Sequence, residues 1–186
     1  MSHAWLFPRT QDVQGRRRII HQANTGLEYL RYGRLVLGPG GGEERFASGE
    51  EELGLVCLGG AGTVEAAGHR YRLGRYDALY VPRDTACRVQ AEGAFDLAEC
   101  AAPVSQRYPV QHVSFQAVCE TPGLVTQAGV APYARTIHTL IGEANVQAGR
   151  LLAGVTFSQD GNWTSWPPHD HHREKEEIYL YVDMPA

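Results

Sequence analysis

Short apolar stretches, separated by turns rich in glycine and proline, recur along most of the chain. Between Tyr29 and Leu37, apolar and polar side chains alternate, which places every second residue on the same side of an extended backbone. Leu53–Leu58 is a continuous apolar run, and a glycine-rich turn at residues 59–62 separates it from another short strand. Long stretches with the 3.6-residue period of an amphipathic helix are absent. The pattern therefore predicts an all-β protein of the sandwich or barrel kind.

Similar apolar runs predict the remaining strands and divide the chain into two halves. These strands are expected at Arg16–Ile20, Tyr71–Leu73, Ala78–Val81, Cys87–Ala91, Phe95–Cys100, Tyr133–Ile141, Leu151–Phe157 and Ile178–Val182. Residues 101–113 hold two prolines and favour a connector. The second half then repeats the plan of the first, so we expect one domain over residues 1–105 and another over residues 106–186.

A histidine-rich stretch near residue 170 is the main candidate for chemistry. His169 and His171 follow two prolines and lie two residues apart, so both imidazoles leave the same face of an extended backbone. His172 has the opposite parity, and we expect it to be a solvated turn residue. His138 comes earlier in the strand order and is not expected to be a ligand.

A carboxylate opens the apolar run that follows the histidines. Strand alternation places Glu177 on one face with Tyr179 and Tyr181, whereas Glu176 shares the other face with apolar side chains. A metal site open to a polar substrate needs the first face, so Glu177 is the predicted ligand and Glu176 the second choice. Two histidines and one carboxylate suit a divalent transition metal with open coordination positions. Such a site is compatible with aldose–ketose isomerisation, with dioxygenation or with binding alone.

Composition narrows the possible partners. The net charge is −4, and no basic tract is present, which argues against nucleic acid or an acidic membrane surface. No apolar run approaches membrane-spanning length and the amino terminus has no signal-peptide core, so a cytoplasmic location is expected. The four cysteines form no Cys-x-x-Cys pair, and Cys57, Cys87 and Cys100 are expected to be buried free thiols.

The motif around the histidines resembles a known family. Its elements are Gly161-Asn162-Trp163, then Pro167-Pro168-His169-Asp170-His171, then Glu176-Glu177-Ile178-Tyr179. They resemble the signature of the 5-deoxyglucuronate isomerases of inositol catabolism, which are related to the uronate ketol-isomerase of pectin breakdown. The resemblance implies a bicupin, with two jelly-roll barrels and the metal in the second. Residues 43–52 are acidic but contain no histidine, so the first barrel is expected to lack a metal.

The resemblance also implies an activity and a set of contacts. The reaction would interconvert 5-deoxy-glucuronate and 2-deoxy-5-keto-gluconate. The metal, zinc by this resemblance with manganese or iron as alternatives, would be held by His169, His171 and Glu177.

Substrate contacts are expected from the residues beside these ligands. Tyr179 and Tyr181 share the face of Glu177, and Arg135 could pair with the carboxylate of the sugar acid. The sequence does not identify a catalytic base.

The resemblance has one departure. No residue before Ala186 matches a further histidine that the family contributes from a later strand, so the second barrel is expected to be incomplete. Open sheet edges in such a barrel favour a homo-oligomer. A non-catalytic sugar-binding or structural cupin and a metal-dependent dioxygenase remain the alternative functions.

Overall fold

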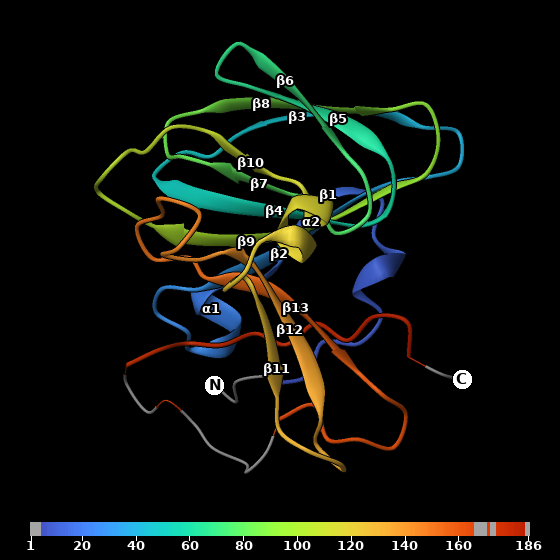
Figure 1. Ribbon diagram of the computed structural model, residues 1–186. Helices are drawn as coiled ribbons and strands as arrows, with labels where there is room; N and C mark the ends of the chain where they lie inside the picture. The colour runs from blue at the N-terminus through green and yellow to red at the C-terminus, as the bar shows by residue number, and fades with distance from the viewer. Residues whose placement is uncertain (1–4, 166–170, 172–173, 185–186) are drawn as a thin grey trace.

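A computed structural model describes residues 5–165, 171 and 174–184, and its elements are almost all antiparallel strands (Figure 1). The strands are β1 (Gly15–Ile20), β2 (Arg31–Leu37), β3 (Gly42–Ala47), β4 (Glu51–Gly60), β5 (Gly62–Ala66), β6 (His69–Leu73), β7 (Ala78–Val81), β8 (Ala86–Ala91), β9 (Phe95–Pro103), β10 (Gln111–Val113), β11 (Val125–Ala128), β12 (Arg135–Ile141) and β13 (Ala153–Ser158). The all-β class expected from the sequence is confirmed.

Two sheets face each other and enclose the larger core. The order in the six-stranded sheet is β1-β2-β9-β4-β7-β10, and in the four-stranded sheet it is β3-β8-β5-β6. Alternate residues of β4, namely Leu53, Leu55 and Cys57, are buried in this core, where they meet Phe95 and Leu97 from β9. Burial of these side chains explains why the apolar run at residues 53–58 forms the centre of the sheet.

The three-stranded sheet β11-β12-β13 extends from the other side of the six-stranded sheet (Figure 1). The helices α1 (Gln22–Thr25) and α2 (Phe115–Glu120) are too short to leave a periodic signal, and a 3-10 turn spans Thr10–Asp12. A second buried cluster joins the sheets, because Leu140 of β12 packs with Val56 of β4. Among the described helices, none has the length and apolar character needed to cross a membrane.

Two expectations about local structure are wrong. Residues 101–113 are not simply a connector, because β9 continues to Pro103 and β10 pairs with β7 along Gln111–Val113. Ile178–Val182 forms no strand, because a strand requires a neighbouring ladder of hydrogen bonds and none of the strands in the described part of the chain pairs with this run. Side-chain contacts hold the segment in place instead. The division at residue 105 stays a prediction.

The cysteine thiols are reduced and unpaired. Cys57 and Cys87 are buried, as expected, whereas Cys100 is only partly buried. Burial raises the pKa of Cys57 and of Cys87 to about 12, and that of Cys100 to about 11. These thiols therefore stay protonated at neutral pH, which excludes them as thiolate nucleophiles.

Replacement of Gly60 by Ala should destabilise the turn between β4 and β5. Gly60 has a φ of 71°, and a Cβ there would lie 1.8 Å from the carbonyl oxygen of Ala94. We expect the free energy of unfolding to fall by about 2–3 kcal/mol, measured by denaturant titration. The adjacent Gly59 is a matched control, because a Cβ there would have no atom within 4 Å. Equal effects of G60A and G59A would contradict the steric explanation.

Candidate metal and substrate site

The segment of residues 174–184 brings two predicted ligands together. The Nε2 atom of His171 lies 3.2 Å from the Oε1 atom of Glu177. The two side chains are 31% and 42% exposed, so a small molecule can reach the pair from solvent. His169 and His172 lie outside the described residues, and the roles expected for them stay predictions.

A tyrosine extends this pair on the same face. The phenol of Tyr179 donates a hydrogen bond to Oε2 of Glu177 at 3.2 Å. Burial and, after it, the neighbouring Glu177 carboxylate raise the pKa of Tyr179 above its ordinary value, while the charge of Arg135 acts in the opposite direction. Tyr179 therefore remains a neutral donor at neutral pH. Tyr181 is exposed, as the alternation predicts for this face.

Arg135 is the first residue of β12. Its Nη1 atom donates to the carbonyl of Tyr133 at 3.2 Å, and its charge opposes the rise that burial causes in the pKa of the Tyr179 phenol. The loop before the histidines is attached to the same region, since Trp163 N–H donates to the carbonyl of Pro132 at 2.7 Å and the Asn162 side chain donates to the carbonyl of Ala134 at 3.1 Å. These two bonds hold the Gly-Asn-Trp element against the start of β12. The motif noticed in the sequence therefore connects the strand that carries Arg135 to the chain that leads toward the histidines.

The opposite face of the segment is turned toward the protein. Ile178 and Leu180 pack against the second buried cluster, and the carboxylate of Glu176 accepts three backbone N–H groups from residues 28–30. The alternation expected from the sequence is thus observed without a strand. Glu176, the second-choice ligand, is occupied by these bonds, which leaves Glu177 as the carboxylate facing His171.

His138 lies apart from the predicted ligands. Its ring packs between Phe115 and Phe157, with centroids 5.1 and 5.3 Å away. Its Nδ1 atom is buried, with no hydrogen-bond partner among the described residues. His138 therefore belongs to an aromatic cluster, and its exclusion from the ligand set stays a prediction.

The donor chemistry at His171 and Glu177 fits a divalent transition metal. Zinc binds imidazole nitrogen and carboxylate oxygen at about 2.0–2.2 Å, so two such ligands at a tetrahedral angle are about 3.3–3.6 Å apart. His171 Nε2 and Glu177 Oε1 lie 3.2 Å apart, as in an ordinary ion pair, so only a small separation of the two side chains would let both reach one cation. Within residues 5–165, 171 and 174–184, no three His, Cys, Asp or Glu side chains form a group able to hold a metal. His169, the third predicted ligand, lies outside these residues and stays a prediction.

Comparison with known proteins gives a family match. The sequence profile of the KduI/IolB family matches residues 5–185. A 4-deoxy-L-threo-5-hexosulose-uronate ketol-isomerase of Cereibacter sphaeroides is 29% identical over 181 residues, which cover 89% of this chain and 64% of that protein. A 5-deoxy-glucuronate isomerase of Bacillus licheniformis is 26% identical over 197 residues, covering 97% of this chain and 70% of that protein. The chain thus spans about two thirds of the length of these relatives.

A solved structure supports the fold. A crystal structure of an IolB-like protein from Salmonella typhimurium LT2 matches with a TM-score of 0.73 and 29% identity, over 84% of this chain and 60% of that chain. Together with the facing antiparallel sheets, this likeness confirms the cupin class expected from the sequence.

Proposed function

Because the chain belongs to the KduI/IolB family, we propose that it is a metal-dependent aldose–ketose isomerase acting on a deoxy-uronate. The proposed reaction converts 5-deoxy-glucuronate to 2-deoxy-5-keto-gluconate. The observation that carries this proposal is the pair of His171 and Glu177, 3.2 Å apart on a solvent-accessible face. Relatives named as isomerases of two deoxy-uronates support the reaction class.

In this proposal His169, His171 and Glu177 hold the metal, and zinc is the ion that their nitrogen and oxygen donors suit, with manganese or iron as alternatives. The cupin fold is typically metal-binding. When bound, such a cation supplies Lewis-acid polarisation of the substrate carbonyl. Glu176 is held elsewhere by three amide bonds and takes no part in the ligand set.

The surrounding residues position the substrate. Arg135 is proposed to bind the sugar carboxylate through a two-point ion pair, which a guanidinium forms better than an ammonium. Tyr179, whose hydroxyl proton is directed to Oε2 of Glu177, presents its remaining lone pairs on this face, where they can accept a hydrogen bond from a substrate hydroxyl. Tyr181 lines the same exposed face. These contacts orient the two carbons between which the isomerisation moves a proton.

The proposal extends to partners and location. A small sugar acid is the ligand, and the net charge of −4 argues against nucleic acid or a membrane surface. Exposed Leu152, Phe157 and Trp163 in the second half favour a homo-oligomer. We place its activity in the cytoplasm.

Removal of the metal should abolish turnover. We expect the purified chain, loaded with zinc, to convert 5-deoxy-glucuronate to its 2-keto isomer without oxygen. Dialysis against a chelator should reduce the rate to background, and added zinc should restore it, because no other group described here can polarise the carbonyl as strongly. The measurement is product formation by nuclear magnetic resonance under anaerobic conditions.

The same assay separates the alternatives. Consumption of the uronate that requires oxygen and gives an oxygenated product in place of the 2-keto isomer would identify a dioxygenase. A zinc-loaded chain that binds the uronate without converting it would identify a binding protein. Either result would overturn the isomerase proposal.

A further inference from the structure

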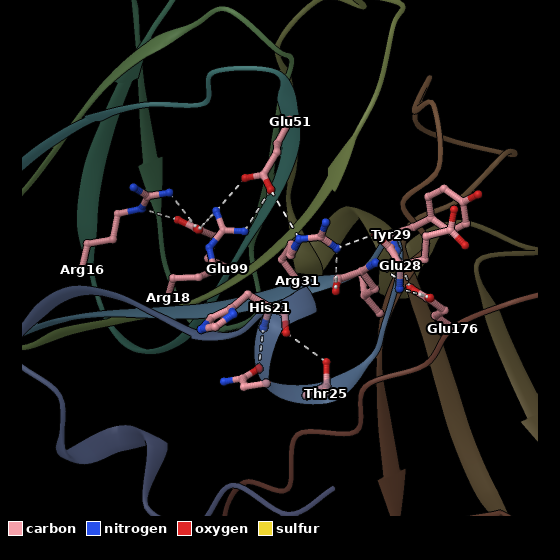
Figure 2. A network of polar contacts seen from close by, with 12 residues as sticks. Arg16, Arg18, His21, Thr25, Glu28, Tyr29, Arg31, Glu51, Glu99 and Glu176 are labelled. Atoms are coloured by element: carbon pink, nitrogen blue, oxygen red, sulfur yellow. Dashed lines mark hydrogen bonds and ion pairs between the residues drawn. The ribbon is translucent and has the colours of Figure 1, made fainter. Parts of the chain in front are cut away.

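The backbone turn that precedes β2 forms a binding site for a carboxylate. The N–H groups of Glu28, Tyr29 and Leu30 donate to the two oxygens of Glu176 at 2.5, 2.9 and 2.6 Å. Three successive amides that converge on one carboxylate form an anion-binding nest. Figure 2 shows Glu176 entering this turn from a distant part of the chain.

An ion-pair network fixes the far side of the nest. Arg31 Nη1 donates to the carbonyl of Glu28 at 2.9 Å, and Arg31 Nε lies 3.9 Å from Glu51. Glu51 binds Arg18 at 2.7 Å, and Arg18 in turn pairs with Glu99, whose side chain is only 1% exposed (Figure 2). The turn that receives Glu176 is therefore tied to β1, β2, β4 and β9 of the six-stranded sheet, so it offers a rigid anchor.

The reverse contact is also present. Glu52, at the start of β4, is fully buried and accepts the N–H groups of Gly149, Arg150 and Leu151 at 2.7, 2.6 and 2.9 Å. This second nest precedes β13 much as residues 28–30 precede β2. Each half of the chain thus contributes one glutamate to a nest in the other half.

The middle residues of the two nests meet. The guanidinium of Arg150 lies over the ring of Tyr29, 4.2 Å from its centroid. The contacts between the halves are thus reciprocal: each half supplies one glutamate and one nest, and the two nests meet through the stacked pair of Arg150 and Tyr29. Glu176 accepts three successive amides from the first half in the same way that Glu52 accepts three from the second.

Placing Glu176 opposite Glu52 aligns the two segments residue by residue. If Glu176 matches Glu52, then Glu177 matches Leu53, which is fully buried in the core between the first two sheets. The apolar side chains agree, since Leu180 then matches Val56 and both contact the second buried cluster. The position that carries a predicted metal ligand in the second half is an apolar core residue in the first.

From this geometry we infer that Glu176 is the positioning residue of the site: its capture by the nest at residues 28–30 fixes Glu177 in the orientation that meets His171. The inference rests on the proposed function, because Glu177 is a metal ligand only in that proposal. The nest that holds Glu176 belongs to the first half of the chain, which is expected to carry no metal. Adjacent residues on an extended backbone point to opposite faces, so fixing Glu176 inward directs Glu177 outward toward His171. The first half thus preorganises the metal ligand of the second.

The test compares three isosteric variants, E176Q, E177Q and E52Q. Zinc dissociation constants are measured by competition with a chromogenic chelator, and amide hydrogen exchange is measured for peptides that contain residues 28–30 or 149–151. In E176Q we expect zinc to bind about 10–100-fold more weakly, as for other residues that orient a ligand, with faster exchange at residues 28–30. E52Q is the matched control: exchange should rise at residues 149–151, while zinc affinity stays within about twofold of wild type.

The outcomes separate the inference from the proposed function. If E177Q binds zinc weakly but E176Q binds it normally, Glu176 is only structural and the positioning role is overturned. If exchange at residues 28–30 is unchanged in E176Q, the carboxylate does not bind that nest, which also overturns it. If the wild-type chain binds no zinc, or E177Q binds it as tightly as wild type, the proposed ligand set fails and the positioning role fails with it.

Discussion

Replacement of His171 by Ala is expected to abolish stoichiometric zinc binding and to lower isomerase turnover by at least about 100-fold. His171 Nε2 lies 3.2 Å from Glu177 and supplies the imidazole of the described donor pair. Changes to residues that only orient ligands already cost about 10–100-fold in affinity, so loss of a ligand itself costs more. Zinc content by mass spectrometry of the dialysed protein and anaerobic turnover measure the two effects.

Stability separates this effect from a loss of fold. The His171 side chain is 31% exposed, so its removal should change the melting temperature of the metal-free protein little. H69A is a matched control, because His69 is an exposed imidazole on β6, and it should keep both zinc and activity. Retention of one zinc per chain in H171A would contradict the ligand assignment.

Much of the fold follows from local patterns. The run at residues 53–58 predicts a buried strand because its side chains are removed from water, and β4 occupies the centre of its sheet. The alternation in residues 176–181 predicts which side chains face the protein, and it does so correctly even where no ladder forms. Whether a side chain is buried decides whether an apolar or a polar residue stands at that position. The sequence therefore shows which residues face the protein even where the backbone forms no hydrogen-bonded ladder.

The long-range contacts that bring the residues of the site together cannot be predicted from the sequence pattern. Glu176 meets backbone amides almost 150 positions earlier, and Glu52 meets amides almost 100 positions later. A nest is made of N–H groups, which every residue except proline has, so residues 28–30 and 149–151 carry no distinctive side chains. The strand β10 is missed for a related reason, because three residues are too few for periodicity.

Replacement of Glu52 by Ala is expected to cause the largest loss of stability, about 4 kcal/mol. Glu52 is fully buried and accepts three N–H groups as well as the hydroxyl of Tyr80, which lies 2.8 Å away. Alanine would leave these buried donors without an acceptor, and an unsatisfied buried group costs about 1–3 kcal/mol. The melting temperature of a chain of this length should fall by roughly 8–16 °C.

The neighbouring Glu50 provides the matched control. Its side chain is exposed, so E50A makes the same chemical change two residues earlier in the sequence and should alter the free energy of unfolding by no more than about 0.5 kcal/mol. Y80F should cost about 1 kcal/mol, because it removes one donor and leaves the three amide bonds of Glu52 in place. If E52A were as stable as E50A, the loop at residues 149–151 would not depend on this carboxylate. The losses in free energy of unfolding should therefore decrease in the order E52A, Y80F, E50A, and the E52A loss measures how much the Glu52 contact with residues 149–151 stabilises the protein. These residues lead directly into β13, which pairs with β12, the strand that carries Arg135.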